Sequence, residues 1–430
     1  MVTTDTTHEA RSGESEPRPA PARRRRHWPT RRALAILLAA CFFFGPAFGF
    51  LLGARPQAIE NRALTPMPSL SDGWSFFPKF TSWAVDHLPL RAEAVKANSV
   101  VSEKVFREAP SFNGDTGGPI GGAPIGTSKK ASSSEYPQVI QGKNGWLYFG
   151  ADVSNLCQPT ADIADTLSRL NRLAHAVQAS GRRFVLAIAP DKSTIYPQEL
   201  PDTYAGRSCA QARRTAFWNA VQKTPPTGYV DLKTPLLAEQ QKSGVPVYRQ
   251  TDTHWGPMGA AIYAQRLAAA LDPALLRDTT VVPKGQTTRT GDLGNMISAP
   301  HADTFADYEL RRPGVVPVGR PDLALPQMPY SPQTFTDSTT GAPLFKPATL
   351  LLGDSFTSAS GATLGSLFAH VTLLHNETSS QYPEAVANQM VGADVVVYEI
   401  VERSVASGRG ALISDASLTA IEKTLAAHPR

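Results

Sequence analysis

The sequence has only three cysteines in 430 residues, and one of them, Cys41, lies within an uncharged hydrophobic run. Neither Cys157 nor Cys209 has a partner at the spacing of a zinc finger, and the chain contains no His-Glu-x-x-His motif. These are the patterns that most often mark zinc sites. We therefore expect no metal site.

Net charge is also scarce outside one segment. The formal charge is +5, but residues 1–32 hold eight arginines against four acidic residues, which accounts for +4 of it. A surface that binds nucleic acid needs concentrated basic residues. The remainder of the chain carries only +1, so we expect no nucleic-acid partner for the folded part. Its composition, 42% hydrophobic and 18% charged, is typical of a globular protein.

Residues 33–54, ALAILLAACFFFGPAFGFLLGA, contain no charge at all. This length is enough for a helix to cross the hydrocarbon core of a membrane. The arginines on its N-terminal side predict a single-pass anchor in the cell membrane, with a disordered basic tail (1–32) in the cytoplasm and the rest of the chain outside. TRRALAI also resembles a twin-arginine export signal and LAAC a lipoprotein cleavage box. The apolar run continues past Cys41, which favours an uncleaved anchor.

In an oxidising compartment, Cys157 and Cys209 are expected to form one structural disulfide. The alternative is two unpaired buried thiols.

The rest of the chain divides by composition. Residues 55–137 are expected to form an extracytoplasmic segment, helical over 76–106 and rich in Gly, Pro and Ser over 109–137. From 138 to 410 apolar strands alternate with amphipathic helices, and 411–430 reads as a C-terminal helix. Runs such as VVVYEI are apolar on both faces, as in strands covered by helices on both sides. The pattern predicts an α/β domain with a mainly parallel sheet flanked by helices.

Two polar motifs each follow a predicted strand. Asp252 and His254 come after VPVYRQ, and Ser355 comes after TLLLGD. Functional groups in open α/β sheets gather beyond the carboxyl ends of the strands. The motifs therefore predict a triad in which Ser355 is the nucleophile, His254 the base and Asp252 the residue that orients it, with free amides of the next helix facing the oxyanion. A turn with a helix cap, a surface Asp–His pair and two metal ligands are the alternative readings of the same residues.

The chain resembles the alginate O-acetyltransferase family, membrane-anchored or periplasmic proteins with an SGNH-hydrolase-like domain that acetylate exported polysaccharides. The similarity covers roughly residues 58–405. The segments that carry it are, in chain order, ENR (60–62), FPKFTSWAVDHLPLR (77–91), GKNGWLYFG (142–150), APDKSTIYPQELP (189–201), VYRQTDTHWGPMGA (247–260), GDLGNM (291–296), LLLGDSF (350–356) and VVYEIVERSV (396–405).

The resemblance implies an SGNH-hydrolase-like fold and the triad roles given above. It also places Asp191, Lys192 and Arg403 near the substrate pocket. For these residues a turn or an ion pair, such as Glu402 with Arg403, is the structural alternative. Trp255 is either a core residue or a platform on which a sugar stacks.

The function implied is extracytoplasmic O-acetyl transfer to hydroxyls of a polysaccharide through an acetyl-serine intermediate. No cofactor is expected, and the acetyl donor would be a membrane-bound acyltransferase, because acetyl-CoA is not expected outside the cell. We see no appended carbohydrate-binding domain after residue 405, so polymer recognition would rest on the catalytic domain or on a partner. The alternatives are a carbohydrate esterase or deacetylase with the same triad, and a catalytically silent glycan-binding scaffold.

Overall fold

The computed structural model describes residues 136–297, 302–318 and 332–430, together with a few isolated residues before position 84. The chain divides into two compact units. The first unit (1–55 and 88–90) lies almost entirely outside the described residues, and the elements below all belong to the second.

Several predicted segments fall on residues that are not described. The predicted tail (1–32) and linker (109–137) lie outside the described residues, apart from the last two linker positions, and the helical segment at 76–106 is described at only four positions. The predicted anchor at 33–54 is described only at Ala33–Ile36 and Phe44. Within the part of the chain that is described, no helix is long and apolar enough to cross a membrane.

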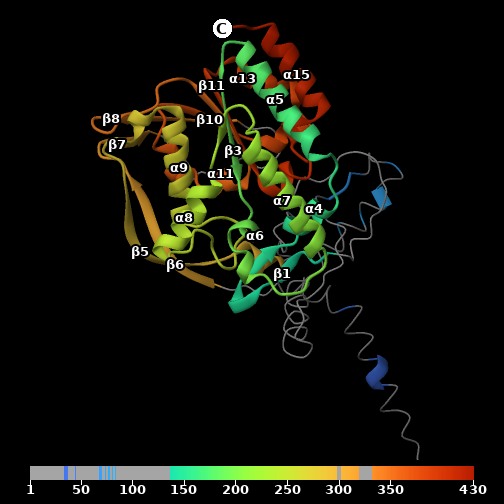
Figure 1. The fold of residues 1–430 in the computed structure, drawn as a ribbon. Helices are drawn as coiled ribbons and strands as arrows, with labels where there is room; N and C mark the ends of the chain where they lie inside the picture. Colours follow the sequence, from blue (N-terminus) through green and yellow to red (C-terminus); the bar gives the residue numbers. More distant parts are fainter. Residues whose placement is uncertain are drawn as a thin grey trace, which may run out of the picture. The chain divides into compact units, whose positions relative to one another are not determined.

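The centre of the domain is a seven-stranded sheet with the order β4-β3-β11-β9-β10-β8-β7 (Figure 1). The pairs from β4 to β10 are parallel, whereas β8 pairs antiparallel with both β10 and β7. The strands span Tyr229–Val230 (β4), Arg183–Ala189 (β3), Val395–Val401 (β11), Thr349–Gly353 (β9), His370–His375 (β10), Gln333–Thr339 (β8) and Val315–Val318 (β7).

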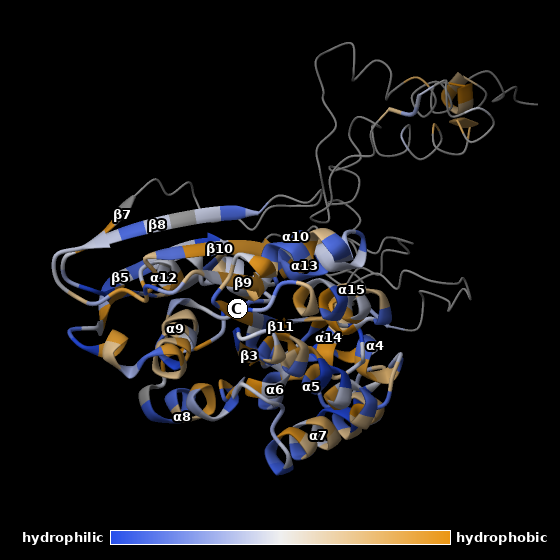
Figure 2. Ribbon diagram, turned by 90° about the horizontal axis from the view of Figure 1, so that it is seen from above, coloured by the Kyte–Doolittle hydropathy of each residue, from blue (hydrophilic) through white to orange (hydrophobic). Residues whose placement is uncertain are grey.

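The sheet is therefore mixed, which corrects the prediction of a mainly parallel one. The strand β8, QTFTDST, is largely hydrophilic (Figure 2). An antiparallel strand next to the edge of a sheet can leave one face in water, so its sequence need not contain a continuous apolar run. That is why the sequence pattern did not reveal this edge.

Helices cover both faces of the sheet (Figure 1). The buried residues fall into two main clusters, one on each face. One face packs against α5 (Ile163–Ala179), α7 (Arg207–Lys223), α13 (Pro383–Val391) and α15 (Asp415–Ala426), and the other against α8 (Lys233–Ser243), α9 (Pro257–Leu271) and α12 (Gly361–Gly365).

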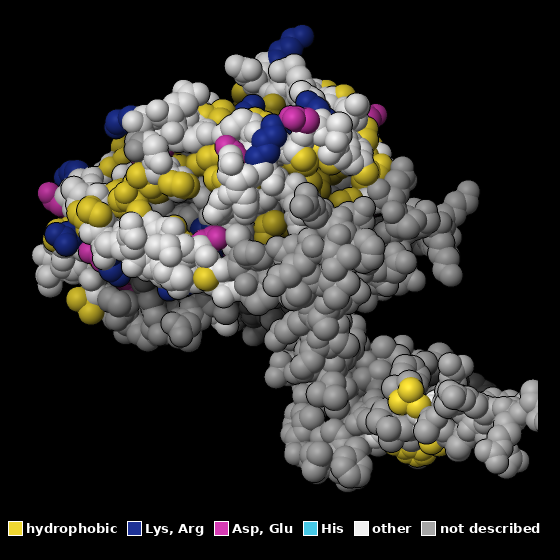
Figure 3. Space-filling model, turned by 90° about the horizontal axis from the view of Figure 1, so that it is seen from below, with side chains coloured by type: hydrophobic (Ala, Val, Ile, Leu, Met, Phe, Trp, Pro, Cys, Tyr) yellow, Lys and Arg dark blue, Asp and Glu magenta, His cyan; other side chains and the backbone are white. Residues whose placement is uncertain are grey.

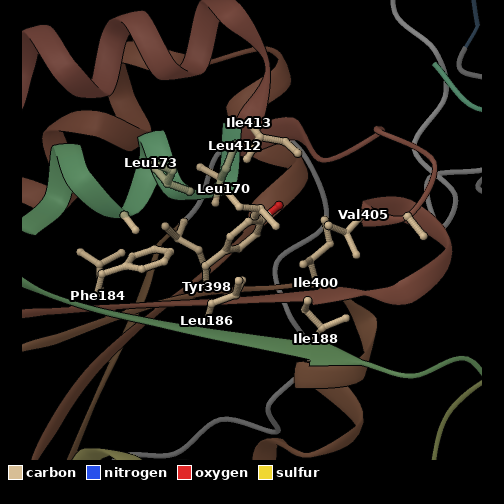
Figure 4. Close-up of a cluster of buried hydrophobic side chains, with 14 of the residues drawn as sticks. Leu170, Leu173, Phe184, Leu186, Ile188, Tyr398, Ile400, Val405, Leu412 and Ile413 are labelled. Carbon is tan, nitrogen blue, oxygen red and sulfur yellow. The ribbon is translucent and has the colours of Figure 1, made fainter. Parts of the chain in front are cut away.

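The strand β3 shows why these sequences are apolar on both sides. Phe184, Leu186 and Ile188 pack with Tyr398 under α5 (Figure 4), while Val185 and the following alternate residues enter the opposite cluster. Side chains alternate between the faces of a strand, so a strand buried on both faces must be apolar at every position.

Smaller elements complete the domain. They are β1 (Val139–Gln141), η3 (Lys143–Gly145), β2 (Leu147–Phe149), α4 (Ala151–Cys157), α6 (Lys192–Ile195), η4 (Pro197–Glu199), η5 (Pro273–Leu276), β5 (Thr280–Thr290), α10 (Asp292–Met296), β6 (Ala302–Arg311), α11 (Ser355–Ala359), η6 (Asn376–Ser380), α14 (Glu402–Val405) and η7 (Ala411–Ile413). The pairs β1–β2 and β5–β6 are antiparallel ribbons outside the central sheet. A disulfide between Cys157 and Cys209 joins α4 to α7, with 5.2 Å between the Cα atoms.

Candidate active site

Ser355 is the first residue of α11, directly after β9 and its Gly353-Asp354 turn. Asp354 fixes this turn: one carboxylate oxygen accepts from the Phe356 N–H at 2.8 Å and the other from the Val401 N–H at 2.9 Å. A Cβ atom at Gly353 would lie 2.2 Å from Oγ1 of Thr357, so only glycine fits there. The Gly-Asp-Ser sequence therefore builds a rigid strand-to-helix turn that presents Ser355 at the carboxyl edge of the sheet.

One of the amides at the start of this helix, which were expected to face the oxyanion, is not free: the Phe356 N–H is bonded to Asp354.

The Asp-x-His motif lies on a hairpin loop and not at the end of a sheet strand, which corrects a second expectation. Tyr248 and Trp255 form one isolated antiparallel bridge, and the Gly256 N–H donates to the Val247 carbonyl at 2.9 Å. The segment between them belongs to none of the strands of the central sheet. Its position depends on contacts with other elements.

Asp252 and His254 form the pair that the sequence predicts. His254 Nδ1 lies 2.8 Å from Asp252 Oδ1, and the His254 N–H donates to the same oxygen at 3.0 Å. Arg249 binds the other carboxylate oxygen at 2.6 Å. Nε2 of His254 is buried and has no hydrogen-bond partner among the described residues. The ring is thus oriented through Nδ1, with Nε2 left to exchange a proton.

The electrostatics of the pair follow from its burial and charges. Burial by itself raises the pKa of Asp252, but the hydrogen bond from His254 and the charges of His254 and Arg249 outweigh it, so this pKa is lowered. Burial by itself lowers the pKa of His254, but the hydrogen bond and charge of Asp252, with a contribution from Asp292, raise it above its ordinary value. Asp252 is therefore ionised, and His254 is a stronger base than a free imidazole.

Aromatic contacts bring the hairpin to the Ser355 turn. The rings of His254 and Phe356 have centroids 5.1 Å apart, and those of Trp255 and Phe356 are 4.9 Å apart. The indole N–H of Trp255 donates to Ser360 Oγ at 2.8 Å. His254 is thereby packed against the residue that follows Ser355. Trp255 itself is 2% exposed, so the structure places it in the core and not on a surface that could stack against a polymer.

Lys192 is hydrogen-bonded to the backbone of this hairpin. Its ammonium donates to the carbonyl oxygens of Arg249 (3.1 Å), Gln250 (3.1 Å) and Asp252 (2.6 Å). Burial lowers the pKa of Lys192 to about 8. The side chain acts on the site through the backbone of the hairpin.

Asp191 and Arg403 form a buried ion pair behind Phe356. The guanidinium lies 2.8 Å from Asp191, 3.5 Å from Asp152 and 5.7 Å from the centroid of the Phe356 ring. Burial, followed by the charge of Asp152, raises the pKa of Asp191 well above its ordinary value. Glu402 pairs with Arg214 at 3.2 Å and not with its neighbour in sequence.

Asp292 is a site residue that the sequence analysis did not single out, although it lies in the GDLGNM segment. It begins α10, accepts from the Thr253 N–H at 2.7 Å, and has Oδ2 3.9 Å from His254 Nδ1. Burial and the charge of Asp252 raise its pKa. The sequence feature that could have indicated Asp292 is the glycine before it. A Cβ atom at Gly291 would lie 2.0 Å from the Thr251 carbonyl oxygen, so the backbone before Asp292 approaches the hairpin too closely for any other residue.

Asp252, His254 and Asp292 each offer a ligand atom within 4.8 Å of the others, which is close enough to hold a cation. However, both oxygens of Asp252 and Nδ1 of His254 already make hydrogen bonds within the protein. A metal ion would have to displace the Arg249 guanidinium or break the Asp252–His254 bond. Hydrogen bonds within the protein therefore compete with metal binding at these residues.

Figure 3 looks from below onto the end of the molecule where β3 runs into α6. Hydrophobic side chains and uncharged atoms make up most of the described surface there, and charged side chains are scattered singly or in small groups.

A sheet flanked by helices, with these residues at its carboxyl edge, defines an SGNH-hydrolase-like α/β domain. The family model described as "SGNH hydrolase-like domain, acetyltransferase AlgX" matches residues 139–363, just over half of the chain. The chain belongs to this family. The family resemblance predicted from the ordered motifs is thereby confirmed.

Individual relatives agree with this assignment. The chain is 34% identical over 135 residues to "Probable alginate O-acetylase AlgJ" of Pseudomonas syringae pv. tomato, covering 31% of this chain and 34% of that protein. It is 27% identical over 228 residues to the protein of the same name from Pseudomonas aeruginosa, covering 52% and 56%. This chain therefore spans between a third and just over half of the length of these curated relatives.

A solved structure titled "O-Acetyltransferase Domain of Pseudomonas putida AlgJ" is 20% identical, with coverage of 67% of this chain and 99% of that one and a TM-score of 0.44.

Proposed function

We propose that this protein is an O-acetyltransferase that moves acetyl groups to hydroxyls of a polysaccharide, with Ser355, His254 and Asp252 as its catalytic triad. The observation that carries the proposal is the Asp252–His254 pair, packed through Phe356 against the Ser355 turn and with Nε2 of His254 unbonded. Membership of an acetyltransferase family supports acetyl as the group transferred. The names of the relatives, which specify alginate as the substrate, support a polysaccharide acceptor.

In the first half-reaction, Ser355 Oγ attacks the carbonyl carbon of an acetyl ester while its proton passes to His254 Nε2. Asp252 stabilises the imidazolium through Nδ1. His254 then returns the proton to the leaving oxygen of the donor, and an acetyl-serine remains.

In the second half-reaction, a sugar hydroxyl takes the place of the donor. Its proton passes to His254 Nε2 as its oxygen attacks the acetyl carbon. Ser355 leaves and recovers that proton from His254. The product is an acetylated polysaccharide and the free enzyme, so atoms and charge balance.

The setting of this reaction is part of the proposal. Residues 33–54 would anchor the protein in the membrane, with the catalytic domain outside the cell and a membrane-bound acyltransferase as the acetyl donor. The uncharged run at 33–54, with arginines on its N-terminal side, supports this arrangement.

The test uses the full-length protein in detergent micelles with p-nitrophenyl acetate and a panel of polysaccharides. Ser355→Ala is compared with the wild type, and Ser358→Ala, in the same short helix, is the matched control. Intact-mass spectrometry detects one added acetyl group, and ester on the polymer is quantified. The proposal expects an adduct that only Ser355→Ala abolishes, and transfer to a polymer that is faster than release to water.

Two results would favour the competing functions. Rapid hydrolysis that no polymer slows or diverts would identify an esterase with the same triad. Absence of both adduct and turnover in the wild type would leave a glycan-binding scaffold as the better account.

A further inference from the structure

Strand β11 carries one acid in an otherwise apolar run. Its sequence is VVVYEIV, all seven residues are buried, and Glu399 is 0% exposed. Alternation along the strand puts Glu399 on the same face as Val397 and Val401, whose cluster also contains Phe356, the residue after Ser355. An ionised carboxylate inside a core is costly unless it is paired, so an acid at this position needs a physical explanation.

Glu399 is bonded to the turn that carries the nucleophile. Its Oε2 accepts from the Asp354 N–H at 2.9 Å and from the Thr357 hydroxyl at 2.8 Å. The first of these residues lies directly before Ser355 and the second lies two positions after it. One oxygen atom from a distant strand therefore fixes the chain on both sides of the nucleophile.

No cation balances Glu399. Among the described residues it forms no ion pair, and the titratable groups that interact with it are Asp354 beside it, Tyr263 of α9 and Tyr398 of its own strand. The charge of Arg403 acts on Asp354. Burial, followed by the charge of Asp354, raises the pKa of Glu399 well above its ordinary value. Two neighbouring carboxyl groups cannot readily both be ionised.

Two more titratable groups come from the next strand and the turn after it. His375 ends β10 opposite Gly353, and Glu377 lies in η6. Burial lowers the pKa of His375 and raises that of Glu377 to about 7, and the charge of Asp354 acts on both. Neither of them donates a hydrogen bond to the Glu399 side chain.

The nearby acid Glu402 provides a comparison within the same protein. It is also 0% exposed, and it likewise accepts from a backbone N–H, that of Asp191, and from a threonine hydroxyl, that of Thr194. However, Glu402 is paired with Arg214 at 3.2 Å. The two acids have the same kinds of donor and differ in whether a cation balances the charge.

The hydrogen bonding of Glu399 leaves one position for a proton. Oε2 already accepts twice, whereas Oε1 is buried and receives no hydrogen bond from the described residues. The Asp354 carboxylate is within hydrogen-bonding reach of the Glu399 acid group. A proton on Oε1 therefore completes the hydrogen bonding of the pair.

We propose that Glu399 is a neutral carboxylic acid in the folded protein and a positioning residue for Ser355. As a neutral acid it supplies the acceptor that fixes the turn without adding a second negative charge beside Asp354. Negative charge develops on the oxyanion when Ser355 attacks, and a nearby anion would oppose it. The inference rests on the proposed function in one respect, that Ser355 is the nucleophile.

The test compares the full-length wild type in detergent micelles with Glu399→Gln, which keeps the shape and the acceptor but cannot ionise, and with Glu399→Leu, which removes the acceptor. Glu402→Gln is the matched control, because it neutralises an equally buried acid that has a cation partner. Urea unfolding is measured from about pH 5.5 to about pH 7. Infrared spectroscopy detects the carbonyl stretch of a protonated carboxylic acid, and kcat and KM are measured for hydrolysis of p-nitrophenyl acetate.

The unfolding measurement has a defined sign. In this window folded Glu399 keeps its proton, whereas the unfolded chain, with the ordinary pKa of 4.5, loses it. Unfolding then releases one proton, so the unfolding constant of the wild type should rise about tenfold per pH unit relative to that of Glu399→Gln. The same ratio for Glu402→Gln should stay constant, because Arg214 balances that charge. Groups such as Glu377 are present in both proteins of each pair and cancel.

The other two measurements test the acid and its role directly. Glu399→Gln should lose a carbonyl band that the wild type and Glu402→Gln retain. Glu399→Leu should lower kcat about tenfold or more with little change in KM, because Ser355 is misplaced, and Glu399→Gln should recover most of that loss.

A ratio that does not change with pH, or the absence of any carbonyl band that Glu399→Gln loses, would show an ionised Glu399 and overturn the proposal. A wild-type kcat in Glu399→Leu would show that Glu399 does not position Ser355. If Glu399→Leu does not fold, the comparison with Glu399→Gln still decides the charge. None of these measurements needs a polymer. The expected results without transfer to any polymer therefore refute only the proposed function, and a constant ratio with transfer intact refutes only this inference.

Discussion

Replacing Lys192 with methionine tests whether this side chain, which binds the backbone of the hairpin that carries Asp252 and His254, is charged inside the folded protein. Lys192 is 1% exposed, and among the described residues its ammonium is bonded only to backbone carbonyls. Its pKa falls from 10.5 to about 8. At about 1.36 kcal/mol per tenfold change in proton affinity, holding this charge inside the protein costs about 3 kcal/mol.

The sign of the pH dependence follows from this lowered pKa. Between about pH 8 and pH 10.5 the unfolded chain keeps the proton that folded Lys192 has released, so the free energy of unfolding rises with pH. The wild type should therefore gain about 3 kcal/mol over Lys192→Met across this window. At pH 7 the variant escapes the cost of the charge, about 3 kcal/mol, but leaves three carbonyls without their donor at about 1–3 kcal/mol each, so it should be no more stable than the wild type.

The assay is urea unfolding of both proteins from pH 7 to pH 10.5, with exposed Lys223→Met as the control for nonspecific effects of alkali. The hairpin in the variant loses its support, so we also expect kcat to fall about tenfold or more through misplacement of Asp252. A stability difference that stays constant across the window, or that falls, would show that Lys192 is not a buried charge and would refute the reasoning.

Three other outcomes are expected. Removing a negative charge near the imidazole by Asp292→Asn should lower the pKa of His254, so the acid limb of the pH–rate profile moves to lower pH; an unmoved limb would show that Asp292 does not act on it. Gly353→Ala puts a methyl group 2.2 Å from the Thr357 hydroxyl, and by thermal unfolding it should cost about 2 kcal/mol or more; a wild-type melting temperature would contradict the tight turn. Opening the disulfide by Cys157→Ser should lower the free energy of unfolding by about 2–4 kcal/mol, and reducing agent should then have no further effect on the variant.

Much of the fold could be predicted from local patterns. The helix at Pro257–Leu271 begins at the proline and ends where its apolar run stops, and β3 follows its apolar run closely. The β1–β2 hairpin turns at Asn144 and Gly145, both with positive φ, as its Asn-Gly sequence indicates. These features depend on neighbours in sequence, so the sequence contains their cause.

The candidate site depended both on local sequence and on tertiary contacts. The sequence places Ser355 correctly at the end of the Gly353-Asp354 turn, which is held locally by the Phe356 N–H and from a distant strand by the Val401 N–H. The Asp-x-His motif could be recognised but not positioned, because its hairpin is held by Lys192 and by rings from distant segments.

The sequence by itself determined which apolar runs form the core strands and helices and which side chains carry the candidate chemistry, because periodicity, glycine turns and motif order act over a few residues. Only the tertiary structure decided the antiparallel edge of the sheet, the burial of Lys192 and Arg403, and the second acid Asp292 beside His254. Each of these depends on packing and charge between segments tens of residues apart, and no local pattern records which segments will meet.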